Sequence, residues 1–286
     1  LTRVIDHTQS VMAVVVRYLR AKAFGIGSVA GVCGSLVGMG GGFVSLPLMT
    51  SFLKISQHQA HATSLAAVAA CGMGGSLGFI STNNVEWGAA AAISASGIIS
   101  ARAGAMFAGR LEGAVLKKVF GIFNILIAPT VLLKSNLKKE PSEDDKKDRD
   151  SGYNTATVIT IAPMAGIGGV VGGISGLFGV GGGSITVPAV ALVSDYNYHK
   201  VLGTSLAAMV LPAISGTYAH HKAGRVIWGI AGPLAAGSAI GCYIGGKYIA
   251  SRVDEEVLKW TFISLMLVVG GRTYYGARHA RIFKFK

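Results

Sequence analysis

The chain has 286 residues, of which 51% are hydrophobic and only 14% are charged, and its formal net charge is +13. An average soluble domain has about 25% charged residues, so this composition argues against a soluble protein. A basic chain can also bind nucleic acid. Here, however, the Lys and Arg residues lie mostly between and beyond long uncharged segments, which argues against that class as well.

No Asp, Glu, Lys or Arg occurs in segments 23–53, 55–85, 151–194 and 226–246. A membrane-spanning helix needs about 20 apolar residues, and each segment meets that length. A large soluble core would instead require a charged face on some of these helices. The sequence therefore predicts an all-α polytopic membrane protein with about eight transmembrane elements.

The predicted elements fall into two halves. In the first half we expect a glycine-rich element broken at its glycines and then three helices, at about 24–53, 58–80, 87–109 and 114–133. In the second half the corresponding elements are expected at about 154–194, 201–220, 226–249 and 256–272. The predicted domains are a basic N-terminal segment at 1–22, a first transmembrane repeat at 23–133, a charged linker at 134–152, a second transmembrane repeat at 153–272 and a basic tail at 273–286.

The two halves are related by an internal repeat. When the sequence is shifted by 141 residues, Gly38 falls on Gly179, Gly40–Gly42 fall on Gly181–Gly183, and TSLAA at 63–67 falls on TSLAA at 204–208. One residue is later inserted in the second half, so that VLKK from Val115 matches VLKW from Val257. A repeat of this kind predicts two homologous four-element halves. Further matches at the first shift are Pro47 with Pro188, His58 with His199, and Trp87-Gly88 with Trp228-Gly229.

The direction of the second half depends on the broken element. If this element crosses the membrane fully, each half has four spans and the halves run parallel. If it turns back, each half has three full spans and the halves are inverted. Counting Lys and Arg favours the parallel arrangement, which places both termini and the linker in the cytoplasm. Gly-x-x-x-Gly spacings such as Gly27/Gly31 and Gly168/Gly172 predict close helix packing in either arrangement.

The glycine motif at 38–42 does not fit a nucleotide site. A phosphate loop ends in Gly-Lys-Ser/Thr, whereas Phe43 and Val44 follow Gly42 here. The dinucleotide fingerprint G-x-G-x-x-G also fails, because Phe43 and Ser184 occupy its last position in the two repeats. An enzyme that uses a nucleotide is therefore disfavoured.

A broken membrane helix explains the motif better. Each glycine costs a helix about 1 kcal/mol relative to Ala, and Pro47 and Pro188 lack a backbone N–H, so we expect these residues to be helix-breaking. Paired breaks in two repeats are typical of a transporter's binding site. Free N–H groups at the start of the following half-helix would suit an anion. The alternative role of the glycines is close packing alone.

At these residues the sequence resembles the sulfite exporter TauE/SafE family, also grouped as the sulfonate-uptake permeases. The resemblance rests on GSLVGMGGGFVSLPLM and GISGLFGVGGGSITVPAV, each followed by H-x-x-x-x-TSLAA, and covers roughly 25–133 and 160–272. It implies a duplicated multi-span transporter of sulfite, organosulfonates or related sulfur-containing anions. The long charged linker departs from the family pattern.

The candidate substrate-binding residues lie in and after the glycine motifs. Backbone N–H groups of the glycines come first, and hydroxyls on short side chains suit sulfite or sulfonate oxygens without a buried charge. These hydroxyls could equally bond back to their own helices or join helices together. The candidates are Gly40, Gly41, Gly42, Ser45, Thr63, Ser64, Gly181, Gly182, Gly183, Thr186, Thr204 and Ser205.

Three further residues are candidates for anion attraction or proton coupling. Arg102 is charged and lies well inside an apolar helix, although its side chain could also extend to the membrane surface. His58 and His199 lie near helix starts, where they could titrate near neutral pH or serve as cap or interface residues. His61 and His220 have no counterpart in the other half and rank lower.

The sequence therefore predicts a secondary transporter of small anions that works by alternating access between two repeats. An anion channel of the same fold is the alternative, and a membrane-embedded enzyme is a weaker one, because no HExxH or CxxC motif occurs. The expected partners are the small anionic substrate and the lipid bilayer, with no nucleic acid, no cofactor and no metal, and the oligomeric state stays open. The expected location is the plasma membrane, or the inner membrane in a bacterium, with both termini in the cytoplasm.

Overall fold

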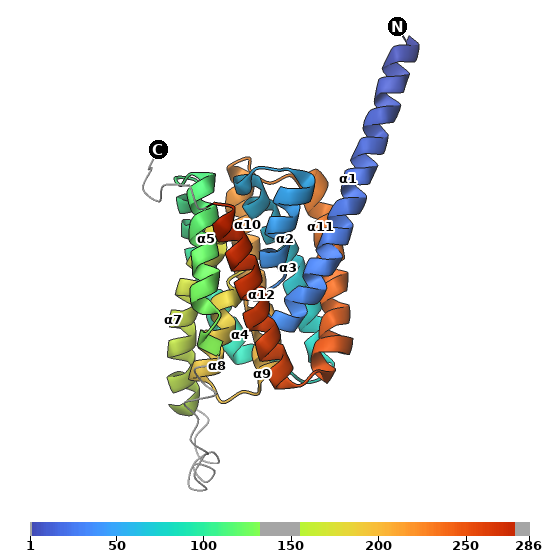
Figure 1. The fold of residues 1–286 in the computed structure, drawn as a ribbon. Helices are drawn as coiled ribbons and strands as arrows, with labels where there is room; N and C mark the ends of the chain where they lie inside the picture. The colour runs from blue at the N-terminus through green and yellow to red at the C-terminus, as the bar shows by residue number, and fades with distance from the viewer. Residues whose placement is uncertain (1, 132–154, 278–286) are drawn as a thin grey trace.

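The computed structural model describes residues 2–131 and 155–277, which form a bundle of helices with no β-sheet among them (Figure 1). The predicted linker at 134–152 and the tail beyond residue 277 lie outside the described residues. Large apolar side chains cover the outer faces of the bundle, where Ile99 is 76% exposed and Val268 is 66% exposed. Such a surface suits lipid rather than water.

The first half contains long helices and a short one that follows the glycine motif. α1 is longer than expected, because it begins in the basic segment at Thr2 rather than near residue 24. Ser56 caps the next long helix, since its side-chain oxygen accepts a hydrogen bond from the Gln59 N–H. The bounds are α1 Thr2–Val37, α2 Gly42–Leu48, the π-helix η1 Met49–Leu53, α3 Gln57–Ile80, α4 Trp87–Ala108 and α5 Gly113–Ile127.

The second half also begins with a long helix and a short helix that follows its glycine motif. Asn197 caps a helix as Ser56 does in the first half, and its side chain accepts from the Lys200 N–H at 2.9 Å. The bounds are α7 Thr155–Phe178, α8 Gly183–Val193, α9 Tyr198–Ala208, α10 Val210–Lys222, α11 Trp228–Ile244, the π-helix η4 Gly245–Ile249, the short 3-10 helix η5 Ala250–Arg252 and α12 Glu255–Tyr275.

A proline divides the helix that was expected at 201–220. α9 ends and α10 begins around Met209, because Pro212 has no N–H to offer the Ala208 carbonyl. The hydroxyl of Ser94 in α4 donates to that carbonyl instead, at 2.7 Å. The interruption therefore joins the two halves by a hydrogen bond, and Tyr198–Lys222 still runs as one apolar segment.

The chain turns back at each glycine motif instead of continuing across the bundle. Gly41 lies against the backbone carbonyl of Ala30, and Gly182 lies against Val171, eleven residues earlier in both cases. In a continuous helix such residues would be about 16 Å apart, at about 1.5 Å per residue. The expectation that the broken element crosses fully is therefore wrong, and the parallel arrangement built on it loses its basis.

Figure 1 shows where each turn leads. α1 enters the bundle and α2 returns to the end where α1 begins and α12 finishes, while α7 begins at the opposite end and α8 returns there. We call these the termini end and the far end. The α4–α5 and α10–α11 loops meet at the termini end, where Gly109 adjoins Arg225. The α8–α9 and α11–α12 loops meet at the far end, where His199 bonds to the Val253 carbonyl.

Glycine faces pack one half against the other. Gly27 of α1 lies against the backbone of Leu234 in α11, and Gly168 of α7 lies against the backbone of Ile93 in α4. The predicted close packing through glycine faces is therefore confirmed. In both cases the first helix of one half packs on the helix that was expected as the third element of the other half.

Helices α3 and α4 and the segment Tyr198–Lys222 are long and apolar enough to cross a membrane, judged by length and composition. The all-helical class is thus confirmed. The total of about eight transmembrane elements stays a prediction, as does the duplication of the fold.

Candidate functional site

The two reversals, residues 38–41 and 179–182, have the same backbone conformation. α1 ends at Val37 and α7 at Phe178, so the predicted breaks at the glycines are confirmed. Side-chain-bearing L-residues rarely adopt a positive φ of this size, which explains the glycines at these positions. The φ angles are +70° at Gly38, +70° at Gly40 and +71° at Gly41, against +66° at Gly179, +83° at Gly181 and +73° at Gly182.

The prolines do not produce the breaks. Pro47 lies inside α2 and Pro188 lies inside α8. A proline there removes one intrahelical hydrogen bond, whereas the left-handed glycines before it have already ended the preceding helix. The expectation that Pro47 and Pro188 are helix-breaking is therefore wrong.

Two serines join each reversal to the opposite half. The hydroxyl of Ser64 in α3 donates to the carbonyl of Gly179 at 2.6 Å, and that of Ser205 in α9 donates to the carbonyl of Gly38 at 2.8 Å. Both serines are fully buried. Each carbonyl belongs to the first glycine of a reversal, so the two bonds hold equivalent points of the two motifs.

The neighbouring threonines make a second matched pair of bonds. Thr63 accepts from the backbone N–H of Ile227 at 3.2 Å, and Thr204 accepts from that of Glu86 at 2.9 Å. Ile227 and Glu86 directly precede α11 and α4, and each belongs to the half opposite its threonine. The four hydroxyls of the two TSLAA segments therefore join the halves in this conformation.

The two reversals meet in the core of the bundle. Gly42 adjoins the backbone of Val180, and Gly183 adjoins that of Met39. Beside them, the side chains of Val68 and Met209 occupy equivalent positions in α3 and α9–α10 and contact both Gly40 and Gly181. Gly40 and Gly181 are therefore buried against apolar side chains in this conformation.

Ser45 and Thr186 bond back to their own helices, one of the two roles that were expected for them. The Ser45 hydroxyl donates to the Gly42 carbonyl at 3.1 Å, and the Thr186 hydroxyl donates to the Gly182 carbonyl at 3.2 Å. In this conformation neither hydroxyl proton is available to a substrate.

Two serines on either side of the second reversal, Ser175 in α7 and Ser184 in α8, were missed by the sequence reasoning. Ser175 and Ser184 are 0% and 1% exposed, and neither hydroxyl has a hydrogen-bond partner among the described residues. Ser184 lies in the first turn of α8, where backbone N–H groups lack intrahelical partners. The sequence could have indicated Ser184 as a candidate, because it directly follows Gly183, the last of three consecutive glycines. An unpartnered buried hydroxyl is costly, so Ser184 joins the candidate anion-binding residues.

His61 and His220, ranked low from the sequence, contact α7 just before the second reversal. The His61 Nδ1–H donates to the Phe178 carbonyl, and its Nε2 accepts from the Gln57 side-chain amide at 2.8 Å. His220 Nε2 lies 3.2 Å from the Gly176 carbonyl. Both rings are buried. His61 and His220 therefore lie close to the second reversal, although neither has a histidine counterpart in the other half.

The other charged candidates lie away from the reversals. Arg102 projects from α4 toward α10, where its Nε donates to the Ser215 hydroxyl at 3.1 Å and its guanidinium lies 5.8 Å from the Tyr218 ring centre. His58 lines a cavity of about 370 Å³ with the α4–α5 loop at the termini end. Neither side chain contacts a glycine of the two motifs in the described structure.

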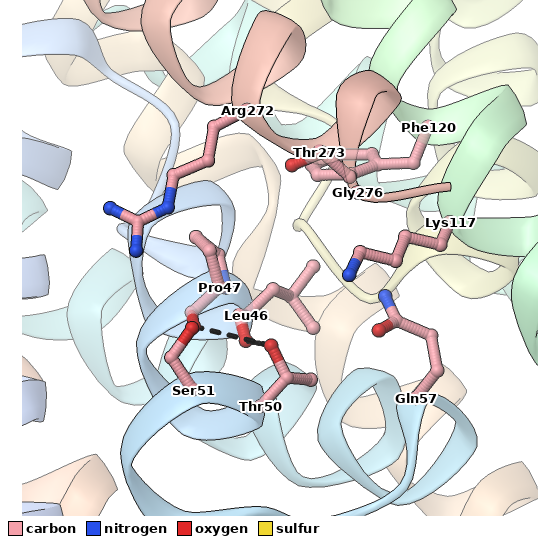
Figure 2. Close-up of a pocket in the computed structure, with 10 residues that line it drawn as sticks. All are labelled: Leu46, Pro47, Thr50, Ser51, Gln57, Lys117, Phe120, Arg272, Thr273 and Gly276. Carbon is pink, nitrogen blue, oxygen red and sulfur yellow. Dashed lines mark hydrogen bonds between the residues drawn. The ribbon is translucent and has the colours of Figure 1, made fainter. Parts of the chain in front are cut away.

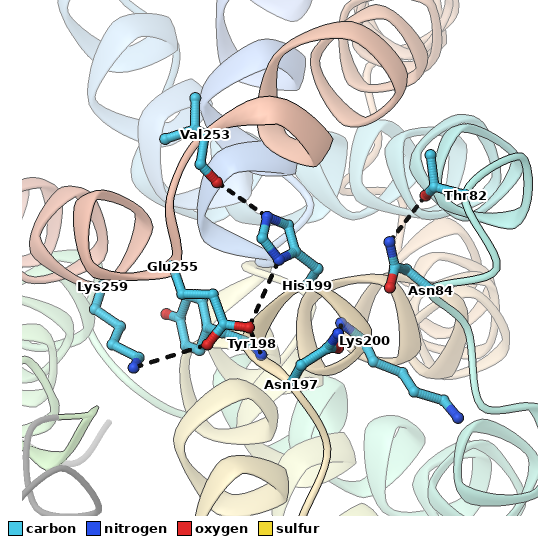
Figure 3. A network of polar contacts seen from close by, with 9 residues as sticks. All are labelled: Thr82, Asn84, Asn197, Tyr198, His199, Lys200, Val253, Glu255 and Lys259. Carbon is cyan, nitrogen blue, oxygen red and sulfur yellow. Dashed lines mark hydrogen bonds and ion pairs between the residues drawn. The ribbon is translucent and has the colours of Figure 1, made fainter.

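His199 belongs to a polar network that closes the far end (Figure 3). Its Nε2 donates to the Val253 carbonyl at 3.0 Å, and its Nδ1 lies 3.7 Å from the Glu255 carboxylate. The same carboxylate accepts from the Tyr198 backbone N–H at 2.9 Å. His199 is thus an interface residue in this conformation.

The network continues to the α3–α4 loop through Lys200, whose Nζ lies 2.7 Å from Glu86. Lys200 also lies 5.0 Å from the ring centre of Tyr196. Burial, with a smaller contribution from Glu86, raises the pKa of the Tyr196 phenol, which therefore stays neutral near neutral pH. At the far end, ion pairs and hydrogen bonds thus join the start of α9 to the residues that lead into α12 and into α4.

The fold and the site together define a class of protein. Lipid-facing apolar helices, paired helix reversals in the core and hydroxyl bonds between two halves belong to an integral membrane transporter built from broken helices. The chain is accordingly a transporter and not an enzyme.

The particular family follows from comparison with known proteins. The model of the sulfite exporter TauE/SafE family matches residues 23–273, so the chain belongs to this family. The chain is 27% identical to the probable membrane transporter protein YunE of Bacillus subtilis over 270 residues. The aligned residues cover 85% of this chain and 92% of YunE.

A second relative is similar over a shorter part of the chain. The probable membrane transporter protein MJ0441 of Methanocaldococcus jannaschii is 27% identical over 204 residues, which cover 69% of this chain and 71% of the relative. No solved structure matches the chain.

Proposed function

We propose that the protein is a secondary transporter of small anions, among them sulfite, organosulfonates or related sulfur-containing anions, and that it works by alternating access between two inverted repeats. The matched bonds from Ser64 to Gly179 and from Ser205 to Gly38 carry this proposal. The description of the family as sulfite exporters supports the sulfur-containing substrate class.

The course of the chain supports inversion of the repeats. α1 enters from the termini end and α7 from the far end, yet the two turn back at equivalent glycines. Contacts between the halves also occur in pairs at the same sequence shift, as with Gly27 on Leu234 and Gly168 on Ile93. Inverted repeats that adopt two alternative arrangements give a transporter its inward-open and outward-open states.

The paired reversals are the proposed centre of transport. The hairpins α1–α2 and α7–α8 contact each other there, and each is held by a serine of the opposite half. Rocking of one half against the other would withdraw Val68 and Met209 from the glycines. The first-turn N–H groups of α8 and the unpartnered hydroxyl of Ser184 would then be free to donate to anion oxygens.

The two ends of the bundle differ in a way that fits one state of this cycle. Cavities of about 270 and 370 Å³ lie at the termini end. At the far end, loops are joined by the network around His199 and Glu255. We assign the structure to a state in which the elements at the far end are held together by this network.

We place the termini end in the cytoplasm. Among the described side chains, Lys and Arg are more numerous there, and cytoplasmic loops are enriched in these residues. At the termini end these are Arg17, Arg20, Lys22, Lys54, Arg110, Lys117, Lys118, Lys222, Arg225 and Arg272, against Lys200, Lys247, Arg252 and Lys259 at the far end. In a bacterium the membrane would be the inner membrane.

The test is uptake of labelled sulfite and of a labelled organosulfonate into proteoliposomes, with protein-free liposomes as the control. We expect saturable uptake above the control, and competition between anions of the same class. Equal uptake by protein-containing and protein-free liposomes, with correctly inserted protein and each anion tried, would contradict the proposal.

A further inference from the structure

A cavity of about 270 Å³ opens at the termini end between η1, the start of α3, α5 and α12 (Figure 2). We call it the basic pocket. Its volume equals about nine water molecules at about 30 Å³ each. It lies just below the range of about 300–1,000 Å³ that is typical of drug-sized ligands. The size therefore suits a small, partly hydrated ion.

The lining of the basic pocket is cationic. Lys117 lines it from α5 and Arg272 from α12, with Leu46 and Pro47 between their charged groups in the view, and Thr50, Gln57 and Thr273 add polar groups (Figure 2). None of its lining residues is acidic, and within residues 2–131 and 155–277 neither cation forms an ion pair. Cationic side chains without an acidic partner attract anions.

The equivalent place in the second half is built differently. Lys259 corresponds to Lys117, but its Nζ lies 4.0 Å from Glu255 and 5.7 Å from the Tyr198 ring centre. Glu255 corresponds to Gly113 in the first half, which has no carboxylate. Tyr198 replaces Gln57 and is only 3% exposed. At the far end, the lysine is therefore paired with a carboxylate and lies near a buried tyrosine.

The basic pocket is also connected to the second reversal. The amide of Gln57 lines the pocket and donates to His61, which donates in turn to the Phe178 carbonyl. The next residue, Gly179, is the acceptor of the Ser64 bond. Two hydrogen bonds thus separate the pocket from the residue before the reversal.

We propose that the basic pocket is an outer binding site for small oxyanions on the termini end, separate from the reversals, with Lys117 and Arg272 as its charged ligands. The proposal rests on the proposed function for the class of anion. An anion there would add negative charge beside the Gln57 amide and so weaken the donation from Gln57 to His61, which couples occupancy of the pocket to α7.

The test is calorimetric titration of the full chain with sulfite under nitrogen, in nanodiscs of phosphatidylcholine. Lys117→Gln and Arg272→Gln should each weaken sulfite binding about tenfold, because each removes a charge-assisted contact. Lys117→Arg should retain most of the affinity. The matched control is Lys259→Gln, which removes the same charge at the equivalent, already paired position and should leave binding unchanged.

Wild-type binding should also weaken as salt is added, because the site is open to solvent. Size-exclusion profiles identical to wild type identify folded variants, and Thr273→Val is a second, uncharged probe that should weaken binding less than Lys117→Gln. Unchanged affinity in Lys117→Gln and in Arg272→Gln, or an equal loss in Lys259→Gln, would overturn the proposal.

A lipid headgroup offers related chemistry, so a second set of nanodiscs contains phosphatidylglycerol. Sulfite binding in phosphatidylcholine that depends on Lys117 supports the proposal, whereas lipid-dependent binding without any sulfite binding overturns it. Failure of the proposed function looks different, since it would abolish uptake by the wild-type chain. If only this inference fails, the wild-type chain still takes up sulfite, and the Lys117→Gln variant binds and transports sulfite as the wild type does.

Discussion

The hydroxyl of Ser64 donates a 2.6 Å hydrogen bond to the backbone carbonyl of Gly179, which begins the second helix reversal. A chain that leaves a helix inside a membrane exposes carbonyls that water cannot satisfy. Ser64 supplies the missing donor from the opposite half, and Ser205 does the same for Gly38. The halves are thus joined at the points where their helices are broken.

Replacing either of these serines should destabilise the protein by a similar amount. We expect Ser64→Ala and Ser205→Ala each to lower the free energy of unfolding by about 1 kcal/mol, within the range measured for hydrogen bonds between membrane helices. Thermal unfolding in detergent checks this. Thr261→Ala is the control, because its exposed hydroxyl bonds only to its own helix at Val257. A Ser64→Ala protein as stable as this control would count against the role of the bond.

His61 should matter as a hydrogen-bond donor rather than as a titrating group. His61→Ala leaves the buried Phe178 carbonyl without its donor, which should cost about 1–3 kcal/mol. His61→Asn keeps an N–H near the position of Nδ1 and should recover part of the loss. The control is His221→Ala, whose ring is exposed and contacts Trp228. Equal melting temperatures for the Ala and Asn variants would contradict this role.

Much of the fold follows from sequence patterns. The uncharged segments gave helices near their observed bounds, such as α3 at Gln57–Ile80. The glycines gave the position of both breaks. The direction of the chain after each break could not be predicted from the sequence, because an element has the same composition whether it crosses the membrane or turns back. The returning path depends on contacts such as Gly41 on Ala30, which join residues of two helices.

The site was only partly predictable, for a related reason. Thr63 and Ser64 were selected for their hydroxyls, but the sequence could not assign them partners in the other half. His61 was ranked low because it has no histidine counterpart in the other half. Glu255 shows the same effect, because Gly113 stands at its equivalent position in the first half and offers no carboxylate.

Loosening the far end should shift the balance between the two states. Glu255→Gln removes the carboxylate that faces His199 and Lys259, although its amide can still bond to the Tyr198 N–H. A partly exposed ion pair contributes up to about 1 kcal/mol, so accessibility at the far end should rise up to about fivefold. The readout is the labelling rate of Ser251→Cys in a background without native cysteines. An unchanged rate would argue against a gate at this place.

The arrangement of the ends can be tested by sidedness. In a chain with Cys33, Cys71 and Cys242 replaced, Ser51→Cys and Lys222→Cys should react with an impermeant reagent from the same side. Lys200→Cys should react only from the opposite side, since it lies at the far end. Reaction of residues 51 and 222 from different sides would contradict the course of the chain, and a cytoplasmic termini end predicts labelling of both only in inside-out vesicles.

The most direct test of the central claim is anion exchange in proteoliposomes. Wild-type protein should show saturable sulfite uptake that is faster when the vesicles are preloaded with sulfite, as a carrier requires. Gly41→Ala and Gly182→Ala should abolish exchange, because a left-handed L-residue costs about 1–2 kcal/mol and the new Cβ would overlap Ala30 or Val171. Gly25→Ala, which has open space around it, should exchange normally. Non-saturating flux without stimulation by preloading, or normal exchange in both reversal variants, would contradict the account.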